Sequence, residues 1–310
     1  MITIEQKKAI ALLLTQERHA LGSWQKVATK VGANVATVSK NMQEESLFGL
    51  VSDQMWQRVG TSLGHQLSDA NWVLVETMNT RWMNKYLSDA QQHAMFLAVS
   101  HKAGQGKSAG ISLYRSKATI GTVFYLECKE FWSHKLFLSK LCQTVGLDAT
   151  GLNLAAMAEA LIDFFKQKAI GCRPVLILDE ANKLSPASLR LIIPLYNELK
   201  GHIGLVIVGA DDLEKHIKSG VRRSVRGYDE LDSRLGRQFM HLVGATEQDV
   251  RAICAANGIG DAKTQKEIWL AMNPQQVLVP VFGRYEDLVD EDLRRLERLI
   301  LDRRISQVQG

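Results

Sequence analysis

The sequence lacks the cysteine pairs that would stabilise a small secreted fold or hold a metal ion. Its four cysteines are scattered, with no C-x-x-C pair and no histidine cluster at metal-ligand spacing: Cys128, Cys142, Cys172 and Cys254. This pattern indicates neither a disulfide framework nor a zinc site. We expect reduced thiols in the core.

Long hydrophobic runs are also missing. The longest apolar runs fall well short of the roughly 20 residues that cross a bilayer. The N-terminus, Met1-Ile-Thr-Ile-Glu-Gln-Lys7, lacks the order of a secretory signal. These absences predict no membrane partner and a cytoplasmic location.

The chain has no strong excess of charge of one sign either. Its 38 basic and 33 acidic residues leave a formal net charge of +5, and 46% of its 310 residues are hydrophobic. Such a composition is that of a globular protein with one large or several smaller domains. A small positive charge permits nucleic-acid binding without requiring it, so the places where the basic residues concentrate matter more.

What the sequence does contain is a glycine-rich stretch between an apolar run, residues 94–99, and a helix-like segment, residues 108–117. In such a loop, backbone N–H groups and the start of the next helix bind phosphate, and a lysine reaches the outer phosphates. The stretch therefore predicts an ATP-binding P-loop in which Lys107 contacts phosphate and the Ser108 hydroxyl holds Mg²⁺. Its five members are Gly104, Gln105, Gly106, Lys107 and Ser108.

The P-loop pattern has one departure. The G-x-x-x-x-G-K-[ST] motif has glycine at the position of His101. Taken alone, the stretch could also be a glycine-rich turn between a strand and a helix.

A second motif, Pro174-Val-Leu-Ile-Leu-Asp-Glu180, favours the P-loop interpretation. A short apolar run of this kind predicts a buried parallel strand with its two acids at the carboxyl edge of the sheet, where ligands bind. Asp179 can hold Mg²⁺, and Glu180 can orient and deprotonate the water that attacks a γ-phosphate. The alternative is an ordinary strand followed by an acidic pair that starts a helix.

Strand-like and helix-like segments alternate through the middle of the chain. Strands are predicted at residues 121–128, 174–179, 203–209 and 238–243, with helices at 133–167 and 186–199 between them. This order predicts an α/β fold with a parallel sheet and right-handed crossovers. The residue after strand 203–209 often senses the γ-phosphate, but here it is Ala210, so we assign that role to no residue.

The first 45 residues predict a helix-turn-helix domain. Thr3 and Gln6 can form a capping box for a first helix that ends near Gly22, a second helix can start at Ser23, and Gly32 suits the turn before a third. The third helix would present three polar side chains to a DNA groove: Thr37, Ser39 and Lys40. A three-helix module for protein contacts is the alternative.

Three further segments complete the expected organisation. Residues 46–68 predict a linker, residues 69–86 a helix whose Trp82 or Tyr86 could touch the adenine, and residues 246–310 a small helical domain. The last helix is predicted at 286–303, with Arg284 at its start as a candidate phosphate contact or a surface residue. The ATPase core would then occupy residues 69–245.

Basic residues concentrate between positions 215 and 237. A solvated loop is the usual explanation of such a charge run. It also suits contacts with a DNA backbone through Lys218, Arg222, Arg223 and Arg226. Within the segment, Leu231-Asp-Ser-Arg-Leu-Gly-Arg237 is typical of an arginine-finger helix that reaches a neighbouring subunit's nucleotide.

With P-loop, acidic strand, Ser-Arg box and C-terminal helices in this order, the chain resembles the AAA+ ATPases. Within them it is most similar to the family of the phage Mu B transposition protein and related ATPases that select transposition targets. The likeness covers residues 27–42, 81–117, 178–184, 204–209 and 233–237. The resemblance implies an AAA+ P-loop parallel sheet core with an N-terminal helix-turn-helix domain and a small C-terminal helical lid.

The resemblance also implies residue roles and a function. It gives Lys107 to phosphate, Ser108 and Asp179 to Mg²⁺, Glu180 to the attacking water, and Arg234 or Arg237 to a neighbour's ATP. The family binds duplex DNA in an ATP-dependent manner, self-associates into a helical filament or ring, presents target DNA to a transposase, and leaves after hydrolysis. Two alternatives stay open, a replication initiator or helicase loader and a DNA-binding regulator with a degenerate ATPase.

Overall fold

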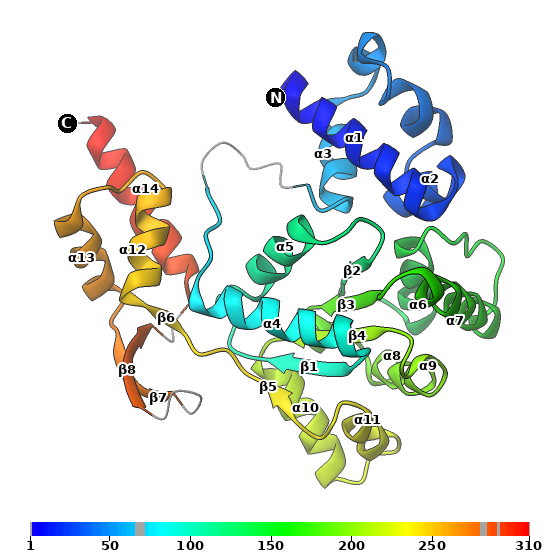
Figure 1. Ribbon diagram of the computed structural model, residues 1–310. Coiled ribbons are helices and arrows are strands. Elements are labelled where there is room, and N and C mark those ends of the chain that lie inside the picture. Colours follow the sequence, from blue (N-terminus) through cyan, green and yellow to red (C-terminus); the bar gives the residue numbers. More distant parts are fainter. Residues whose placement is uncertain (1, 66–71, 280–283, 290–291, 310) are drawn as a thin grey trace.

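A five-stranded parallel sheet, with the strand order β2-β3-β4-β1-β5, carries the central part of the fold (Figure 1). The computed structural model describes residues 2–65, 72–279, 284–289 and 292–309. The sheet strands are β1 (Phe96–Ser100), β2 (Val123–Glu127), β3 (Val175–Asp179), β4 (Gly204–Gly209) and β5 (Phe239–Met240). The predicted α/β fold with a parallel sheet is confirmed.

Helices cover both faces of this sheet, which explains why its inner strands are apolar throughout. On β1, Leu97 and Val99 face one side and Phe96 and Ala98 the other, because successive side chains alternate across a strand. The first face is covered by α4 (Met78–His93) and α5 (Lys107–Lys117). The second is covered by α6 (His134–Thr144), α7 (Leu154–Gly171), α8 (Pro186–Arg190), α9 (Ile192–Leu199), α10 (Asp211–Arg222) and α11 (Tyr228–Arg234).

Helix α4 begins later than the predicted helix at residues 69–86. Thr77 and Thr80 form a capping box at its start, so the helix begins at Met78. Residues 72–77 lie outside any helix or strand, and residues 69–71 fall outside the described part of the chain. Trp72 and Val75 pack against the C-terminal domain instead of continuing the α4 stripe. The three- and four-residue spacing of these apolar residues was therefore misleading.

The N-terminal helices follow the predicted caps. They are α1 (Ile4–Leu21), α2 (Trp24–Val31), the π-helix η1 (Thr37–Asn41), the 3₁₀-helix η2 (Glu45–Leu50) and α3 (Asp53–Ser62). Thr3 caps α1 in a capping box, Ser23 caps α2, and Gly22 and Gly32 end the two helices with left-handed backbones. The predicted DNA-facing helix is present over residues 35–41, and its last five residues form a π-type segment.

The predicted linker at residues 46–68 is corrected by the structure. Phe48 and Trp56 pack edge to face, with ring centroids 4.9 Å apart, in the same apolar cluster as α1 and α2. Lys7 and Asp53 join α1 to the start of α3 through an ion pair of 3.1 Å. Residues 45–62 therefore belong to the N-terminal domain, and only residues after α3 can serve as a connection to the core. A single sequence did not reveal this, since the segment has Gly49, Gly60 and mixed polar residues.

The C-terminal domain combines three helices with a small antiparallel sheet. The helices are α12 (Glu247–Ala256), α13 (Ala262–Ala271) and α14 (Arg294–Gln309), and the strands, in the order β6-β8-β7, are β6 (Ala245–Thr246), β7 (Gln275–Val279) and β8 (Arg284–Val289). The helix predicted at 286–303 is wrong at its start. Residues 286–288 pair with β7 and residues 288–289 with β6, Leu288 and Val289 are buried, and Arg284 lies on β8.

All four cysteines are free. Cys128, Cys142 and Cys254 are buried, as expected for core thiols. Burial raises the pKa of Cys128 to about 12, so its thiol is inert at neutral pH. Within the described residues, no helix is both long enough and apolar enough to span a bilayer.

The packing of α3 leads to a test of the N-terminal domain boundary. We expect the fragment 1–64 to unfold cooperatively on heating and the fragment 1–41 to show little stable helix. The shorter fragment lacks the part of the apolar cluster supplied by Phe48, Val51, Trp56 and Val59. Circular dichroism melts of the two fragments check this. Equal, cooperative melts would contradict the boundary.

Candidate nucleotide-binding site

The predicted phosphate loop joins the carboxyl end of β1 to the N-terminus of α5. Gly104 and Gly106 have positive φ values of 73° and 81°, a conformation that other L-residues adopt at a cost. His101, which replaces the first glycine of the usual motif, is not among the residues with positive φ. The substitution at this position is therefore compatible with the loop, because its backbone does not require glycine.

Lys107 is the first residue of α5 and is only 7% exposed. Its Nζ donates to the carbonyl oxygens of His101 at 2.6 Å and Lys102 at 2.8 Å, so the ammonium group lies against the loop itself. Burial lowers the pKa of Lys107, and the nearby Asp179 and Glu180 carboxylates oppose that shift. The arrangement provides a fixed cation at the mouth of an anion-binding loop.

Ser108 and Asp179 meet as predicted from their motifs. The Ser108 hydroxyl donates to Asp179 Oδ2 at 2.8 Å, and the backbone N–H of Glu180 donates to Asp179 Oδ1 at 2.9 Å. Asp179 is 1% exposed, and this burial raises its pKa. A hydroxyl and a carboxylate oxygen are the hard ligands that Mg²⁺ takes beside substrate phosphates, so these two residues fit that ion.

Glu180 lies directly after β3 in a left-handed backbone conformation, with φ of 54°. Such a conformation is costly for a residue with a side chain and often occurs at functional positions. Its carboxylate lies 3.1 Å from Lys183 and lines the same cavity as Lys107. Glu180 is therefore placed where an attacking water could be oriented.

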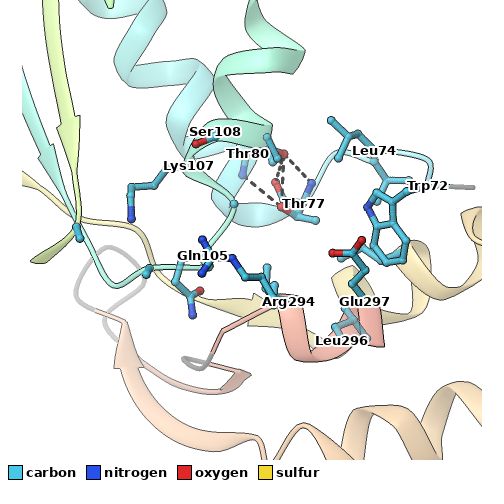
Figure 2. Close-up of a pocket in the computed structure, with 18 of the residues that line it drawn as sticks. Trp72, Leu74, Thr77, Thr80, Gln105, Lys107, Ser108, Arg294, Leu296 and Glu297 are labelled. Atoms are coloured by element: carbon cyan, nitrogen blue, oxygen red, sulfur yellow. Dashed lines mark hydrogen bonds between the residues drawn. The ribbon is translucent and has the colours of Figure 1, made fainter. Parts of the chain in front are cut away.

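A cavity of about 390 Å³ extends from the loop toward the C-terminal domain (Figure 2). Its apolar part is lined by Trp72, Val75, Ile253 and Leu296, which come from the segment before α4 and from the lid helices. The ring centroids of Trp82 and Tyr86 lie 5.8 Å apart, and neither residue lines the cavity, so the suggested adenine contact by either is not borne out. Trp72, which the expected helix at 69–86 included, lines the cavity instead.

Arg294 is one of the charged residues of the cavity that sequence reasoning missed, with Lys183 and Glu297. It is the first residue of α14, and Figure 2 shows its side chain pointing toward Gln105 in the phosphate loop. Its positive charge contributes to the lowered pKa of Lys107. The suggested phosphate contact Arg284 belongs to β8 instead, because the last helix begins ten positions later than that residue. Sequence reasoning missed Arg294 because it placed the start of the last helix at residue 286 instead of residue 294.

Asn79 ties the phosphate loop to the chain that leads into the lid. It is 1% exposed, its amide group donates to the Gln105 carbonyl at 3.0 Å, and its carbonyl oxygen accepts from the N–H groups of Val243 at 2.9 Å and Gly244 at 3.0 Å. A buried side chain with this many partners holds its neighbours in one arrangement. Nothing in a single sequence distinguishes Asn79 from an ordinary helical asparagine.

The basic segment at 215–237 is largely helical rather than a loop. Lys218 lies on α10, where its Nζ pairs with Asp232 at 2.8 Å and donates to the Arg237 carbonyl at 3.0 Å. These internal partners already engage the Lys218 ammonium group, and its assignment to DNA binding stays a prediction. Arg222, Arg223 and Arg226 are exposed at the end of α10 and in the turn before α11, as the DNA-contact prediction requires.

The two candidate finger arginines differ in their surroundings. Arg234 ends α11, pairs with Glu230 at 2.8 Å and donates to Asn197 at 3.2 Å, whereas Arg237 lies beyond the helix with φ of 57°. The helix expected over residues 231–237 therefore ends at Arg234 and does not include Arg237. The Arg237 side chain is 54% exposed against 25% for Arg234, so Arg237 is the more accessible of the two.

In the N-terminal domain, Lys40 is exposed and Thr37 and Ser39 are partly exposed on η1. These residues are separated in sequence from the nucleotide cavity and do not line it. Figure 1 shows the N-terminal helices and the C-terminal domain at different sides of the central sheet.

A phosphate loop, an acidic β3 end, this sheet order and a lid that closes the cavity together define a P-loop nucleotide-binding protein of the AAA+ fold. Residues 90–217 match the family described as AAA domain. The match runs from the end of α4 through the phosphate loop and β3 into α10. Fold and family match support an AAA+ ATPase, as the motifs predicted, and neither distinguishes the transposition ATPases within that class.

Among solved structures, the chain is similar to the ORC1 protein of Aeropyrum pernix in complex with DNA, with a TM-score of 0.51, 17% identity, and coverage of 79% of this chain and 64% of that one. Cdc6p from Pyrobaculum aerophilum gives a TM-score of 0.47 at 15% identity, covering 70% of this chain and 59% of the other. The chain thus spans less than two thirds of either protein. No curated protein matches the sequence.

The position of Arg294 predicts a contribution to nucleotide affinity. Because its guanidinium points at the phosphate loop, we expect Arg294→Ala to weaken ATP binding about tenfold or more, the scale of one charge-assisted hydrogen bond. Arg298→Ala, at an exposed position of the same helix outside the cavity lining, is the control and should bind as the wild type does. Titration with a fluorescent ATP analogue measures both. Equal affinities for the two variants would remove Arg294 from the site.

Proposed function

We propose that this protein is an ATP-hydrolysing AAA+ protein that binds duplex DNA in an ATP-dependent manner. The observation that carries the ATPase part is the meeting of Ser108 and Asp179 beside the phosphate loop, with Glu180 on the same cavity. This constellation is what hydrolysis of a nucleoside triphosphate needs, namely phosphate positioning, a place for Mg²⁺ and a carboxylate for the attacking water.

Each residue has a separate part in the proposed reaction. The loop amides and Lys107 hold the phosphates, while Ser108 and Asp179 would hold Mg²⁺, which supplies charge neutralisation at the phosphate oxygens. Glu180 accepts a proton from the attacking water. Its ion pair with Lys183, at 3.1 Å, holds the carboxylate at the edge of the cavity. Arg294 adds a second cation from the lid side of the cavity.

Completion of the site by a second subunit is part of the proposal. At the surface, Arg237 forms an ion pair of 2.8 Å with Asp229. A more highly charged anion on a neighbouring subunit could replace Asp229 as its partner. Arg234 is held by Glu230, Asn197 and the Tyr196 ring, whose centroid is 5.7 Å from the guanidinium carbon. Of the two, Arg237 is therefore the preferred arginine finger. Arg234 instead helps to hold the end of α11 in place through these contacts.

Two exposed surfaces support the DNA part of the proposal. The α10–α11 turn groups Arg222, Arg223 and Arg226, where flexible cations can contact successive phosphates. The N-terminal domain presents Lys40 from η1. The ORC1 protein, whose fold this chain shares, has a structure in complex with DNA.

Within this class, we propose target-DNA delivery to a transposase, with the protein assembled as a filament on DNA and released by hydrolysis. The small helical domain placed directly before an AAA+ core favours it. The fold shared with ORC1 favours the alternative, a replication initiator or helicase loader. ATP-dependent filaments on DNA that bind a transposase support delivery, whereas recruitment of a helicase supports the alternative.

The division of labour in the site predicts two different defects. We expect Lys107→Ala to lose ATP binding, because the fixed cation at the phosphates is removed, and Glu180→Gln to keep ATP binding but lose nearly all hydrolysis. Equilibrium binding and phosphate release measure the two effects. An unchanged ATP affinity in the Lys107→Ala protein would overturn the phosphate-loop assignment, and normal turnover by Glu180→Gln would overturn the role of that carboxylate.

The arginine turn predicts a change in the salt dependence of DNA binding. Replacing Arg222, Arg223 and Arg226 by glutamine should weaken binding to all sequences alike and reduce the slope of log affinity against log salt by roughly 0.9 per lost phosphate contact. A matched control replaces three lysines that form surface ion pairs on other elements, Lys85, Lys166 and Lys266. Equal slopes for the two triple variants would show that overall charge, and not this turn, contacts DNA.

A further inference from the structure

Tyr125 contacts Asp179, the carboxylate proposed to hold Mg²⁺, and neither the phosphate-loop motif nor the β3 motif includes Tyr125. Its hydroxyl donates to Asp179 Oδ2 at 3.2 Å, and this oxygen also accepts the Ser108 hydroxyl at 2.8 Å. Tyr125 lies on β2, which pairs with β3 in parallel, so the ring reaches the carboxylate from the neighbouring strand. The proposed metal ligand is thus oriented from two sides.

The Tyr125 ring is covered by a cation from the phosphate-loop helix. The guanidinium carbon of Arg115, on α5, lies 4.4 Å from the ring centroid. The cation therefore stacks on the ring whose hydroxyl donates to Asp179, and it links α5 to that carboxylate through Tyr125.

Arg115 also contacts the N-terminal domain. Its Nη2 donates to the carbonyl oxygen of Ser62, the last residue of α3, at 3.5 Å. Gly64 approaches the guanidinium so closely that a side-chain carbon there would lie 2.9 Å from Arg115 Nη2. The N-terminal domain, the guanidinium, the phenol ring and the carboxylate therefore form one continuous line of contacts.

This line runs along a cleft between the N-terminal domain and the core. The cleft has a volume of about 570 Å³ and is lined by Lys30 and Arg58 on one side and by Arg115, Tyr125 and Glu127 on the other. Arg115 lines this cleft while it contacts both Ser62 and the Tyr125 ring, so a shift of the N-terminal domain would reach the ring through the guanidinium group.

We propose that Tyr125 is a positioning residue for Asp179 and that Arg115 makes its orientation depend on the position of the N-terminal domain. The inference rests on the proposed function, because it concerns the same Mg²⁺-ATP site. A hydrogen bond to a metal-binding carboxylate fixes the direction in which the carboxylate presents its free lone pairs. Movement of the N-terminal domain would then change how well the site holds Mg²⁺ without touching nucleotide.

The test compares affinity for a fluorescent ATP analogue in Mg²⁺ and in EDTA. The ratio of the two affinities reports the metal site alone. We expect Tyr125→Phe, which keeps the ring and its stacking, to reduce that ratio about tenfold, the usual size of such an effect, and to leave the EDTA affinity unchanged. The control is Tyr114→Phe on α5, because the Tyr114 hydroxyl donates to Gln91 and not to Asp179.

A second variant tests whether Arg115, which contacts the N-terminal domain, acts through Tyr125. Arg115→Met should reduce the Mg²⁺ ratio about threefold, the scale of one cation–π contact, and should have no further effect in a Tyr125→Phe background. Independent, additive effects would show that Arg115 does not act through Tyr125.

The same experiment distinguishes a failure of this inference from a failure of the proposed function. If the wild-type protein gains no affinity from Mg²⁺, the proposed metal site itself is wrong. If it does gain affinity and Tyr125→Phe keeps the full gain, only the positioning role is overturned.

Discussion

The hydrogen bond between Ser108 and Asp179 is the contact around which the site is arranged. It joins the first turn of α5 to the end of β3, two segments about 70 residues apart in the chain. A carboxylate that is 1% exposed loses most of its hydration, and it is tolerated because two hydroxyls and a backbone N–H donate to it. Burying this charge without those donors would be costly. The three elements involved, β2, β3 and α5, are therefore held in one relative arrangement.

The lid is joined to the same site by buried polar contacts. Asn79 binds the phosphate loop on one side and the chain before β6 on the other. Asp249 of α12 accepts from the N–H of Met78 at 3.0 Å, which fixes the start of α4 against the lid. A rotation of the lid would leave these polar groups without partners. The N–H of Leu293 donates to the Gly104 carbonyl at 3.0 Å, which places the start of α14, with Arg294, beside the phosphate loop.

The N-terminal domain also packs against the ATPase core. Lys168 of α7 donates to the carbonyl of Ala20 at 3.1 Å, and Phe164 packs against the clusters of both domains. With Arg115 contacting Ser62, the domain touches the core at the phosphate-loop helix as well as at α7. The two domains are therefore joined through both helices.

Local signals in the sequence determined much of the secondary structure and the main motifs of the site. The alternation of strands and helices, the phosphate loop, the acidic end of β3 and the caps at Thr3, Ser23 and Thr246 are all present in the structure, because each depends on neighbouring residues and on short-range hydrogen bonds. The pairing of Ser108 with Asp179 also followed, since parallel strands bring their carboxyl ends to one edge.

Only the tertiary structure decided which residues complete the site. Trp72, Asn79, Tyr125 and Arg294 reach it from segments whose local patterns are unremarkable, and their positions depend on where α4 and α14 begin and on which strands are neighbours. The linker, the lid strands and the paired state of Lys218 were missed for the same reason. Periodicity in a sequence reports which side of an element is buried, whereas the partner that buries it is chosen by the packing of the whole chain.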